Sequence, residues 1–349
     1  MRIILVGFGV VGKSVTTVLA KRYEEKVKDY GVNPKIVAIA DLDGAVIDPR
    51  GLSPQKLSEI RQRGFPISKD PEFGHPGMSV SDVIESVEAE VVVEVTPVNI
   101  KDAEPALSHI TKAFKTGKHV VTTNKGPLAL AMPALMELAE YNNVHFRFSG
   151  TVGGGTPVLE FAKRCLAGDK ILAIKGILNG TTNYILSEMA QNRITFQEAL
   201  ANAQKLGYAE REPSMDVDGL DAACKVVILA NWILNQKITL KNVEITGIRD
   251  VSLQALDEAS KKGNTIKLIG SIDGPEPTVK PVEIAKASPL CVSGVLNAVT
   301  FYTEYAGEET IIGKGAGGIE TASAVLRDLL DIRHKLANRM LNENSESLK

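Results

Sequence analysis

Residues 7–14 read GFGVVGKS and directly follow an apolar run, RIILV, at residues 2–6. An apolar run of this length that ends at a glycine is typical of a buried strand followed by a sharp turn. We therefore expect a strand at 2–6 and a helix that begins near Gly9 and continues towards Asp29. A strand, a glycine-rich turn and a helix in this order form the first half of a βαβ unit.

The glycine-rich turn satisfies two phosphate-binding patterns at once. Gly7, Gly9 and Gly12 form G-x-G-x-x-G, the dinucleotide fingerprint. Gly7 and Gly12 with Lys13 and Ser14 form G-x-x-x-x-G-K-S, the P-loop of nucleoside triphosphatases. Each motif alone is a weak signal, because both occur after a strand and before a helix. The turn by itself leaves the choice open between a dinucleotide and a nucleoside triphosphate.

Residues around the turn favour the dinucleotide. Val10 and Val11 are apolar, which suits the first turn of a helix packed on a sheet. A second apolar run, KIVAIAD, ends in Asp41, where a carboxylate can accept hydrogen bonds from the ribose hydroxyls of NAD; a plain turn residue is the simpler explanation of Asp41. A P-loop enzyme also needs a magnesium-binding aspartate after a second apolar strand, and VVVEVTP offers Glu94 instead.

Strand and helix patterns alternate as far as residue 150. The expected strands lie at 2–6, 35–41, 90–97, 118–125 and 144–150, and later helices are expected at 102–117 and 133–142. Ser53 and Pro54 predict the start of another helix, as N-cap and first helical residue, and Gly64 predicts its end. Strands separated by helices predict an α/β fold of Rossmann type, with a doubly wound parallel sheet.

The pattern changes at the glycine-rich stretch GTVGGGTP, residues 150–157. Beyond it we expect an α+β domain with a capping box at Thr195 and Glu198, an apolar helix at 219–234 and several strands between 243 and 312. GKGAGG, at 313–318, introduces a final helix at 319–340. The expected organisation is therefore a dinucleotide-binding domain at 1–150, a second domain at 151–312, a C-terminal segment at 313–340 and a frayed tail at 341–349.

The composition is that of an ordinary globular protein. Of the 349 residues 44% are hydrophobic and 23% charged, and the net charge of -2 gives no electrostatic reason to expect nucleic acid or an anionic membrane. No apolar run reaches transmembrane length, and the N-terminus lacks a secretory signal. Cys165, Cys224 and Cys291 are scattered, which suits a reducing cytoplasm and no thiolate metal site. The histidines show no zinc-binding spacing.

The expected helix at 219–234 is apolar on nearly all sides, yet it carries Asp221 and Lys225 four residues apart. A lysine that is partly buried beside a carboxylate can act as a proton donor or acceptor for an alcohol/carbonyl pair. A structural ion pair explains the same spacing equally well. NGTTN, at 179–183, is either a plain N-cap or a group of backbone N–H donors for a carboxylate. Lys125 follows a strand at the carboxyl edge of the sheet, where ligands bind, or is simply a surface lysine.

Taken together, these stretches resemble the homoserine dehydrogenase family over nearly the whole chain. The matching segments occur in the family's order: GFGVVG, TTNKGPLA, GTVGGGTPV, GILNGTTNYIL, GYAEREPSMDVDGLDAACK and GKGAGGIETASAVLRDL. The most diagnostic is the block G-Y-x-E…D-x-x-G-x-D-x-x-x-K. The resemblance implies reversible, NAD(P)-dependent hydride transfer between L-aspartate 4-semialdehyde and L-homoserine, a step towards threonine, methionine and isoleucine.

The resemblance also implies roles for individual residues. Lys225 matches the proposed acid/base, Asp221 the carboxylate that positions the lysine and substrate, and Lys125 a second catalytic lysine that can polarise the substrate oxygen. The implied substrate-binding residues are Glu210, a partner for the substrate ammonium, with Asp216, Asn179, Gly180 and Thr181. The implied cofactor-binding residues are Gly7, Gly9, Val10, Val11, Gly12, Asp41, Thr96, Pro97, Asn124, Lys125, Gly315 and Gly317, with the final helix packing on the first domain.

Further family features are expected with one departure. The family's sodium or potassium site, formed mainly by backbone carbonyls, matches Val152, Gly154 and Thr156, but the family's glutamate ligand aligns with Ser149, which puts the ion in doubt. The second domain is implied to be catalytic and to form a homodimer. The chain ends about twenty to thirty residues past the GAGG helix, so we expect no C-terminal regulatory domain.

Alternatives remain at this point. One alternative is another NAD(P)-dependent enzyme of the same architecture, such as aspartate-semialdehyde dehydrogenase, whose chemistry needs a nucleophilic cysteine. Cys165 and Cys224 are both expected within helices, which disfavours this alternative. A catalytically silent NAD(P)-binding regulator would not need a carboxylate paired with a buried lysine. The choice between NAD and NADP stays open, because Asp41 repels a 2′-phosphate whereas a basic residue such as Arg50 would attract it.

Overall fold

The computed structural model describes the main chain of residues 1–21, 31–64 and 66–346, and side chains among these as far as residue 337. The chain divides into two compact units. Unit 1 comprises Met1–Pro127, Ala134–Thr151 and the chain from Gly317 onward, and unit 2 comprises Leu128–Pro133 and Val152–Ala316. The dinucleotide fingerprint therefore lies in unit 1, and the Asp221–Lys225 pair lies in unit 2.

Unit 1 is built on a seven-stranded sheet in the order β4-β3-β2-β1-β5-β6-β7. Its strands are β1 (Arg2–Val6), β2 (Lys35–Asp41), β3 (Gly44–Ile47), β4 (Gly74–Pro76), β5 (Val91–Glu94), β6 (His119–Thr122) and β7 (Phe146–Arg147). The pairs from β2 to β7 are parallel, and β3 and β4 add an antiparallel edge. Because β1 pairs with β2 on one side and β5 on the other, the winding reverses at β1, where open α/β sheets bind ligands.

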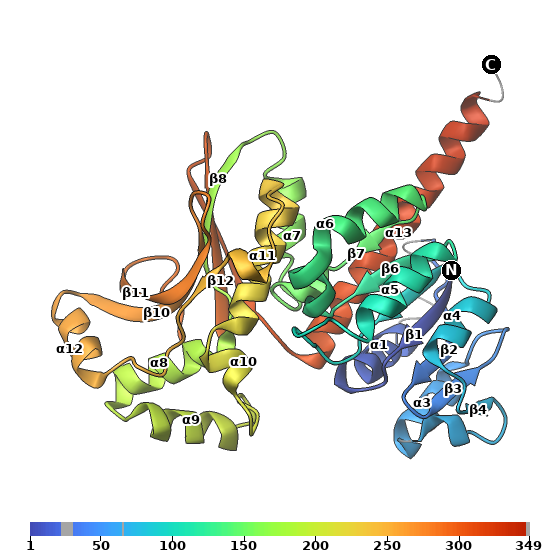
Figure 1. Ribbon diagram of the computed structural model, residues 1–349, viewed down its shortest axis with the longest axis horizontal. Coiled ribbons are helices and arrows are strands. Elements are labelled where there is room, and N and C mark those ends of the chain that lie inside the picture. The colour runs from blue at the N-terminus through green and yellow to red at the C-terminus, as the bar shows by residue number, and fades with distance from the viewer. Residues whose placement is uncertain (22–30, 65, 347–349) are drawn as a thin grey trace. The chain divides into compact units, whose positions relative to one another are not determined.

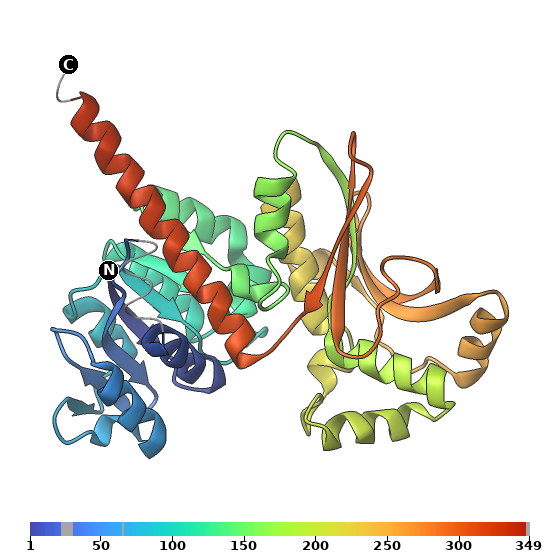
Figure 2. The same ribbon diagram turned by 180° about the vertical axis from the view of Figure 1, so that it is seen from behind.

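Helices cover both faces of this sheet (Figures 1 and 2). They are α1 (Val10–Lys21), α3 (Pro54–Arg63), α4 (Val80–Ser86), α5 (Ala106–Lys115), α6 (Lys125–Tyr141) and α13 (Gly318–Glu346), with short turns η1 (Ile67–Lys69) and η2 (Ser149–Thr151). Buried residues of α1, α3 and α13, such as Val15, Leu57 and Val325, share one core with Leu5 and Val93 of the strands. The confirmed fold class is thus α/β, with the last helix packed on the first sheet.

Unit 2 contains a six-stranded sheet in the order β13-β12-β8-β10-β11-β9, antiparallel except for the β9–β11 pair. Its strands are β8 (Ile171–Ile177), β9 (Glu244–Ile245), β10 (Asn264–Ile272), β11 (Thr278–Ala285), β12 (Leu296–Thr303) and β13 (Glu308–Lys314). Its helices are α7 (Val158–Glu160), the π-turn η3 (Phe161–Cys165), α8 (Gly180–Asn192), α9 (Phe196–Lys205), α10 (Ser214–Val217), α11 (Leu220–Leu234), η4 (Leu240–Asn242) and α12 (Leu253–Lys261). A Cβ at Gly270 would lie 2.7 Å from the side chain of Val226, so α11 packs tightly on β10.

Two helices begin at other residues than the sequence led us to expect. The helix expected from 102 begins only at Ala106, after Ala103, which has a positive φ of 64°. The helix expected at Pro133 is the second part of α6, which begins at Lys125 and is interrupted by the non-helical Ala131. Pro133 thus follows a kink rather than opening a separate helix, because proline is tolerated near the start of a helical segment.

The observed ends of two elements also differ from the expected ones. The strand expected at 144–150 shrinks to Phe146–Arg147. The final helix continues to Glu346, so most of the segment expected to be a frayed tail is helical, and no glycine or proline occurs there to end it. The expected continuation of α1 towards Asp29 lies outside the described residues. Among the described residues, no helix combines the length and apolar character needed to span a membrane.

Candidate active site

The glycine-rich turn is tightly packed at two glycines and open at the third. Gly7 has a φ of +95°, a left-handed conformation that favours glycine, and its N–H donates to the carbonyl of Ala40 over 2.9 Å. A Cβ at Gly12 would lie 2.2 Å from the carbonyl oxygen of Gly7, so only glycine lets α1 approach the turn this closely. A Cβ at Gly9 would meet nothing within 4 Å. The turn therefore fits a dinucleotide, whose pyrophosphate needs close approach to the backbone.

The P-loop interpretation is wrong. Residues from Val10 onward already belong to α1, so the N–H groups between Gly9 and Lys13 do not form a phosphate-cradling loop. The hydroxyl of Ser14 donates to the carbonyl of Val10 over 2.8 Å, and the ammonium of Lys13 lies 5.9 Å from the centre of the Phe8 ring. Val10 is 74% exposed, so the expected packing of its side chain on the sheet is also wrong.

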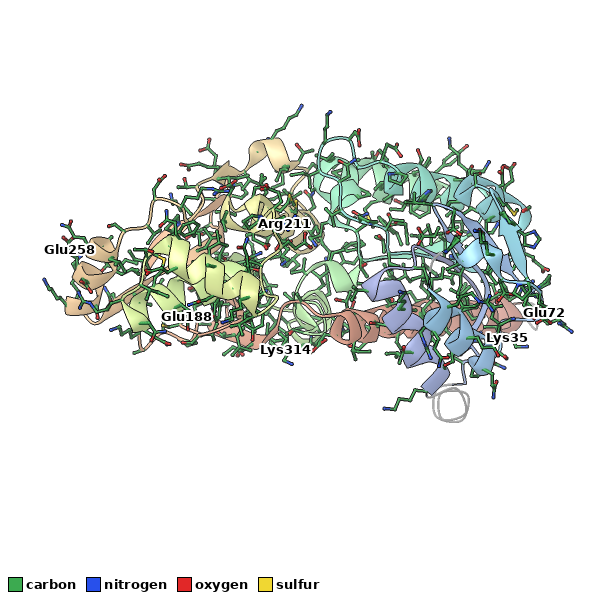
Figure 3. The ribbon with its side chains drawn as sticks, turned by 90° about the horizontal axis from the view of Figure 1, so that it is seen from below. Lys35, Glu72, Glu188, Arg211, Glu258 and Lys314 are labelled. Atoms are coloured by element: carbon green, nitrogen blue, oxygen red, sulfur yellow. The ribbon has the colours of Figure 1, made fainter. Side chains whose placement is uncertain are left out.

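Asp41 ends β2 at the same edge of the sheet as the turn. Its carboxylate accepts hydrogen bonds from the N–H of Phe8 over 2.5 Å and of Leu42 over 2.7 Å. Arg50, which could have favoured a 2′-phosphate, instead donates to Asp48. Arg50 adjoins Gly51 in the sequence, and a Cβ at Gly51 would lie 3.1 Å from the side chain of Lys35, the first residue of β2. Lys35 is labelled in Figure 3. A seven-residue strand separates the two ends by about 20 Å.

Two further strands deliver polar residues to this edge. Thr96 and Pro97 follow β5, and Asn124 and Lys125 follow β6. The side-chain amide of Asn124 donates to the carbonyls of Thr96 over 3.1 Å and Pro97 over 3.0 Å, and its oxygen accepts from the N–H of Gly126 over 3.0 Å. Asn124 is thus the N-cap of α6 and connects the two strand ends, with Lys125 as the first residue of the helix.

In unit 2 the expected lysine–carboxylate pair is formed. The ammonium of Lys225 lies 2.7 Å from a carboxylate oxygen of Asp221 and donates to the carbonyl of Leu178 over 2.6 Å. Lys225 is 6% exposed, because α11 buries almost its whole length. The side-chain amide of Asn179 donates to Asp221 over 2.9 Å and to Asp216 over 2.6 Å. Four of the expected site residues therefore lie together at the start of α8 and α11.

The two carboxylates influence each other in this cluster. Burial raises the pKa of Asp216, and the negative charge of Asp221 raises it further, whereas hydrogen bonds from Asn179 and Thr181 and the charge of Lys225 lower it. The hydroxyl of Thr181 also donates to the carbonyl of Tyr208 over 2.8 Å. The cluster thus combines one cation with two carboxylates that share an amide donor, an arrangement suited to holding a proton near a reacting oxygen.

The remaining expected substrate residues lie at the border of the cluster. Gly180 begins α8, and a Cβ there would approach the carbonyl of Val295 to 2.7 Å. Glu210 is exposed, and its carbonyl accepts from the side chain of Gln204 over 3.0 Å. In the described part of the chain no hydrogen bond or ion pair joins the carboxylate of Glu210 to Asp216 or Lys225.

The glycine-rich stretches of unit 2 pack on each other. A Cβ at Gly154 would lie 3.0 Å from the carbonyl of Gly315, and one at Gly315 would collide with the side chain of Asn297. The carbonyl of Thr156 accepts from the N–H of Val158 over 2.8 Å. Close packing thus explains the small residues at these positions.

The expected monovalent-cation site consists mainly of backbone carbonyls, and the serine at its departing position has another partner. In unit 1, both the N–H and the hydroxyl of Ser149 donate to the carboxylate of Asp328, so Ser149 does not replace the family's glutamate ligand. The described residues also contain no group of three or more histidine, cysteine, aspartate or glutamate side chains that could hold a metal. A cation bound by the carbonyls of Val152, Gly154 and Thr156 stays a prediction from the family resemblance.

Comparisons with known proteins match both units. The family model described as Homoserine dehydrogenase matches residues 157–330, and the one described as Homoserine dehydrogenase, NAD binding domain, matches residues 7–149. A homoserine dehydrogenase from Methanocaldococcus jannaschii is 48% identical over 332 residues, which cover 95% of this chain and 98% of the relative. The chain belongs to the homoserine dehydrogenase family.

Two other members of the homoserine dehydrogenase family bear on the cofactor. An NAD(+)-dependent homoserine dehydrogenase from Pseudomonas canavaninivorans is 40% identical over 349 residues, with 97% of each chain covered. The structure of a hyperthermophilic archaeal homoserine dehydrogenase in complex with NADPH is 29% identical, has a TM-score of 0.83 and covers 96% of this chain and 98% of its own. The protein is therefore an oxidoreductase that uses NAD or NADP and interconverts L-aspartate 4-semialdehyde and L-homoserine, a step of amino-acid biosynthesis.

Membership of the homoserine dehydrogenase family excludes the nucleoside triphosphatase and aspartate-semialdehyde dehydrogenase alternatives. Of the two cysteines considered as nucleophiles, Cys224 is fully buried in α11, whereas Cys165 is exposed at the end of η3. Family membership, rather than thiol burial, therefore decides against aspartate-semialdehyde dehydrogenase chemistry. Sequence reasoning missed the carbonyl of Leu178, because a backbone oxygen carries no residue-type signal. It also missed that the side chain of Asn179 bridges two carboxylates. The place of Asn179 directly before a helix N-terminus could have suggested that its side chain makes hydrogen bonds.

Proposed function

We propose that Lys225 is the acid/base of homoserine dehydrogenase chemistry in this chain and that Asp221 holds it in place. The observation that carries the proposal is the contact of 2.7 Å between the two side chains within a buried helix. A bound reduced nicotinamide cofactor supplies the hydride that reaches the aldehyde carbon. Lys225 supplies the proton to the oxygen during reduction and removes it during oxidation.

The hydrogen-bond inventory of Lys225 supports this role. An ammonium has three N–H donors, and the contacts with Leu178 and Asp221 account for two of them. The third can donate to a substrate oxygen. This interaction strengthens as negative charge develops on that oxygen, which is the requirement for catalysis. Asn179 donates to Asp221 and Asp216 and thereby restricts the orientation of both carboxylates.

The other expected residues enter the proposal by their positions. Asp216, Gly180 and Thr181 border the Lys225 cluster and are proposed to bind the substrate, with Glu210 as a partner for its ammonium group. The cofactor is proposed to bind along the edge formed by the glycine-rich turn, Asp41 and the ends of β5 and β6, with Gly315 and Gly317 as further contacts. Lys125 is proposed as a second lysine that polarises the substrate oxygen.

The experiment that tests the proposal is oxidation of L-homoserine with NAD⁺ or NADP⁺, followed by the absorbance of the reduced nicotinamide. We expect Lys225→Ala to lower kcat at least about a hundredfold, the low end for loss of a general acid/base. Lys175→Ala is the matched control, because Lys175 is another lysine of unit 2 and forms an ion pair with Asp273. This substitution should leave kcat unchanged.

Two results would contradict parts of this proposal. If the Lys225→Ala variant remained active, the acid/base role would have to be assigned to Lys125 or to a water molecule. A folded wild-type protein that reduces neither nucleotide, and that oxidises neither NADH nor NADPH with the semialdehyde, would be a silent nucleotide-binding member of the family.

We further propose a homodimer formed through unit 2. The family resemblance supports it. Light scattering should then give twice the chain mass of 37.5 kDa, and the single-chain mass would refute the dimer. A cytoplasmic location is also proposed, because the three cysteines are few and scattered along the sequence, and cell fractionation tests it.

A further inference from the structure

Glu94 is a fully buried carboxylic acid at the carboxyl end of β5. It pairs across the sheet with Val6 on one side and Thr122 on the other, so neither neighbouring strand offers it a charged partner. A buried carboxylate that lacks a cation is costly unless several hydrogen bonds stabilise it. The position of such a group at the ligand-binding edge of the sheet therefore calls for a functional explanation.

The carboxylate of Glu94 is the centre of a hydrogen-bond network. One oxygen accepts from the N–H of Thr96 over 3.0 Å and also from the Thr96 hydroxyl. The other accepts from the hydroxyl of Thr122 over 2.9 Å. Thr122 in turn accepts from the N–H of Asn124 over 3.0 Å, and the Asn124 side chain donates to the carbonyls of Thr96 and Pro97.

We propose that Glu94 is a positioning residue of the cofactor site, which acts by fixing Thr96 and Thr122 and, through them, Asn124 at the start of α6. Glu94 itself is buried beneath this edge and does not touch the cofactor. The inference rests on the proposed function, which assigns Thr96, Pro97, Asn124 and Lys125 to cofactor binding. It extends that assignment to a group inside the sheet.

The protonation state of Glu94 makes the proposal testable. Burial raises its pKa to about 7, and the hydrogen bonds from Thr96 and Thr122 only partly offset this. On α5, which also packs on β5, the ionisable side chains are His109, Lys112 and Lys115, and none of them contributes to the shift.

The two protonation states differ in what they can accept. An ionised carboxylate accepts from all three donors, whereas a protonated one must itself donate one hydrogen bond. The hydrogen bond between Glu94 and Thr122 therefore reverses direction and loses its negative charge as the pH falls through about 7, the pKa of Glu94.

Glu94→Gln imitates the protonated state while preserving the size of the side chain. The amide oxygen can still accept from Thr96, and the amide nitrogen can donate to Thr122, whose hydroxyl also lies 3.1 Å from the carbonyl of residue 94. The measured quantity is the dissociation constant of NADH, followed by its fluorescence, at pH 6 and pH 8.5. We expect the variant to bind about tenfold more weakly at pH 8.5, because charge-assisted hydrogen bonds to Glu94 become weaker neutral ones, and within about twofold at pH 6.

Asp70→Asn is the matched control. Asp70 is also a buried carboxylate of unit 1, with ion pairs to Lys56 and Arg63, but it lies between η1 and β4. Its loss should lower thermal stability without changing the affinity for NADH at either pH. An equal loss of affinity in both variants, or a pH-independent difference between wild type and Glu94→Gln, would overturn the proposal.

Two additions keep the test decisive. Should Glu94→Gln fail to fold, wild-type affinity must still weaken as the pH falls through about 7, and a flat profile would refute the role of Glu94. Asn124→Ala tests the underlying assignment. A variant at Asn124 that binds NADH normally would show that the proposed cofactor site is wrong, whereas weak binding by Asn124→Ala with normal binding by Glu94→Gln would reject only the inference about Glu94.

Discussion

At the scale of single residues, Asp41 bears most directly on the choice of cofactor. Its carboxylate is fixed by the N–H groups of Phe8 and Leu42 at the end of β2, the position where a carboxylate binds the ribose hydroxyls of NAD. The 2′-phosphate of NADP would bring a second negative charge to this point. Arg50 cannot compensate, because it pairs with Asp48 at the other end of the strand.

We therefore expect the wild-type protein to prefer NAD⁺ over NADP⁺. Asp41→Asn removes the charge but keeps an oxygen that can accept from Phe8, and it should reduce the preference about tenfold. The measurement is the ratio of kcat/KM for the two nucleotides with L-homoserine. Asp48→Asn, which removes a carboxylate beside Arg50, should leave the ratio unchanged. A wild-type enzyme that favours NADP⁺ would contradict this interpretation of Asp41.

At the scale of elements, the helices and strands that the sequence predicts correctly are those whose bounds depend on neighbouring residues. The strands at 2–6 and 35–41 and the helix between Ser53 and Gly64 have their expected bounds, because apolar runs, a capping serine and a terminating glycine act on neighbouring residues. The small strands β3 and β4 were not predicted, since their pairing joins segments about thirty residues apart. The kink of α6 at Ala131 lies two residues before Pro133, which marked an interruption in the sequence but not that the helix continues on both sides of it.

The two halves of the candidate site differ in the same way. The contact between Asp221 and Lys225 could be predicted, because a spacing of four residues on a helix brings two side chains together. The link of Asn124 to Thr96 could not, because the two residues follow different strands, and only the order of the strands makes them neighbours. The partners of Glu94 were hidden for the same reason.

At the scale of the whole molecule, a second buried ionisable group predicts how stability depends on pH. Lys267 of β10 is 3% exposed, and its ammonium donates to the side chains of Asn183 over 2.7 Å and Ser187 over 2.9 Å, both neutral groups of α8. Burial lowers its pKa from 10.5 to about 8, with a smaller opposing effect from Cys291. Between these pH values the unfolded chain binds more protons than the folded one, so stability should rise with pH.

The size of this rise has an upper limit of about 3 kcal/mol, because each pKa unit corresponds to about 1.4 kcal/mol. Thermal unfolding between pH 8 and pH 10 measures it, with the transitions of the two units followed separately where they resolve. Lys267→Met should flatten the pH dependence, since it removes the titrating group and the cost of burying its charge. Lys280→Met, at an exposed lysine of β11, should retain the wild-type slope. If the stability of Lys267→Met still rose with pH as in the wild type, another group would be responsible for the pH dependence. Lys267 would then stay charged in the folded protein over this pH range.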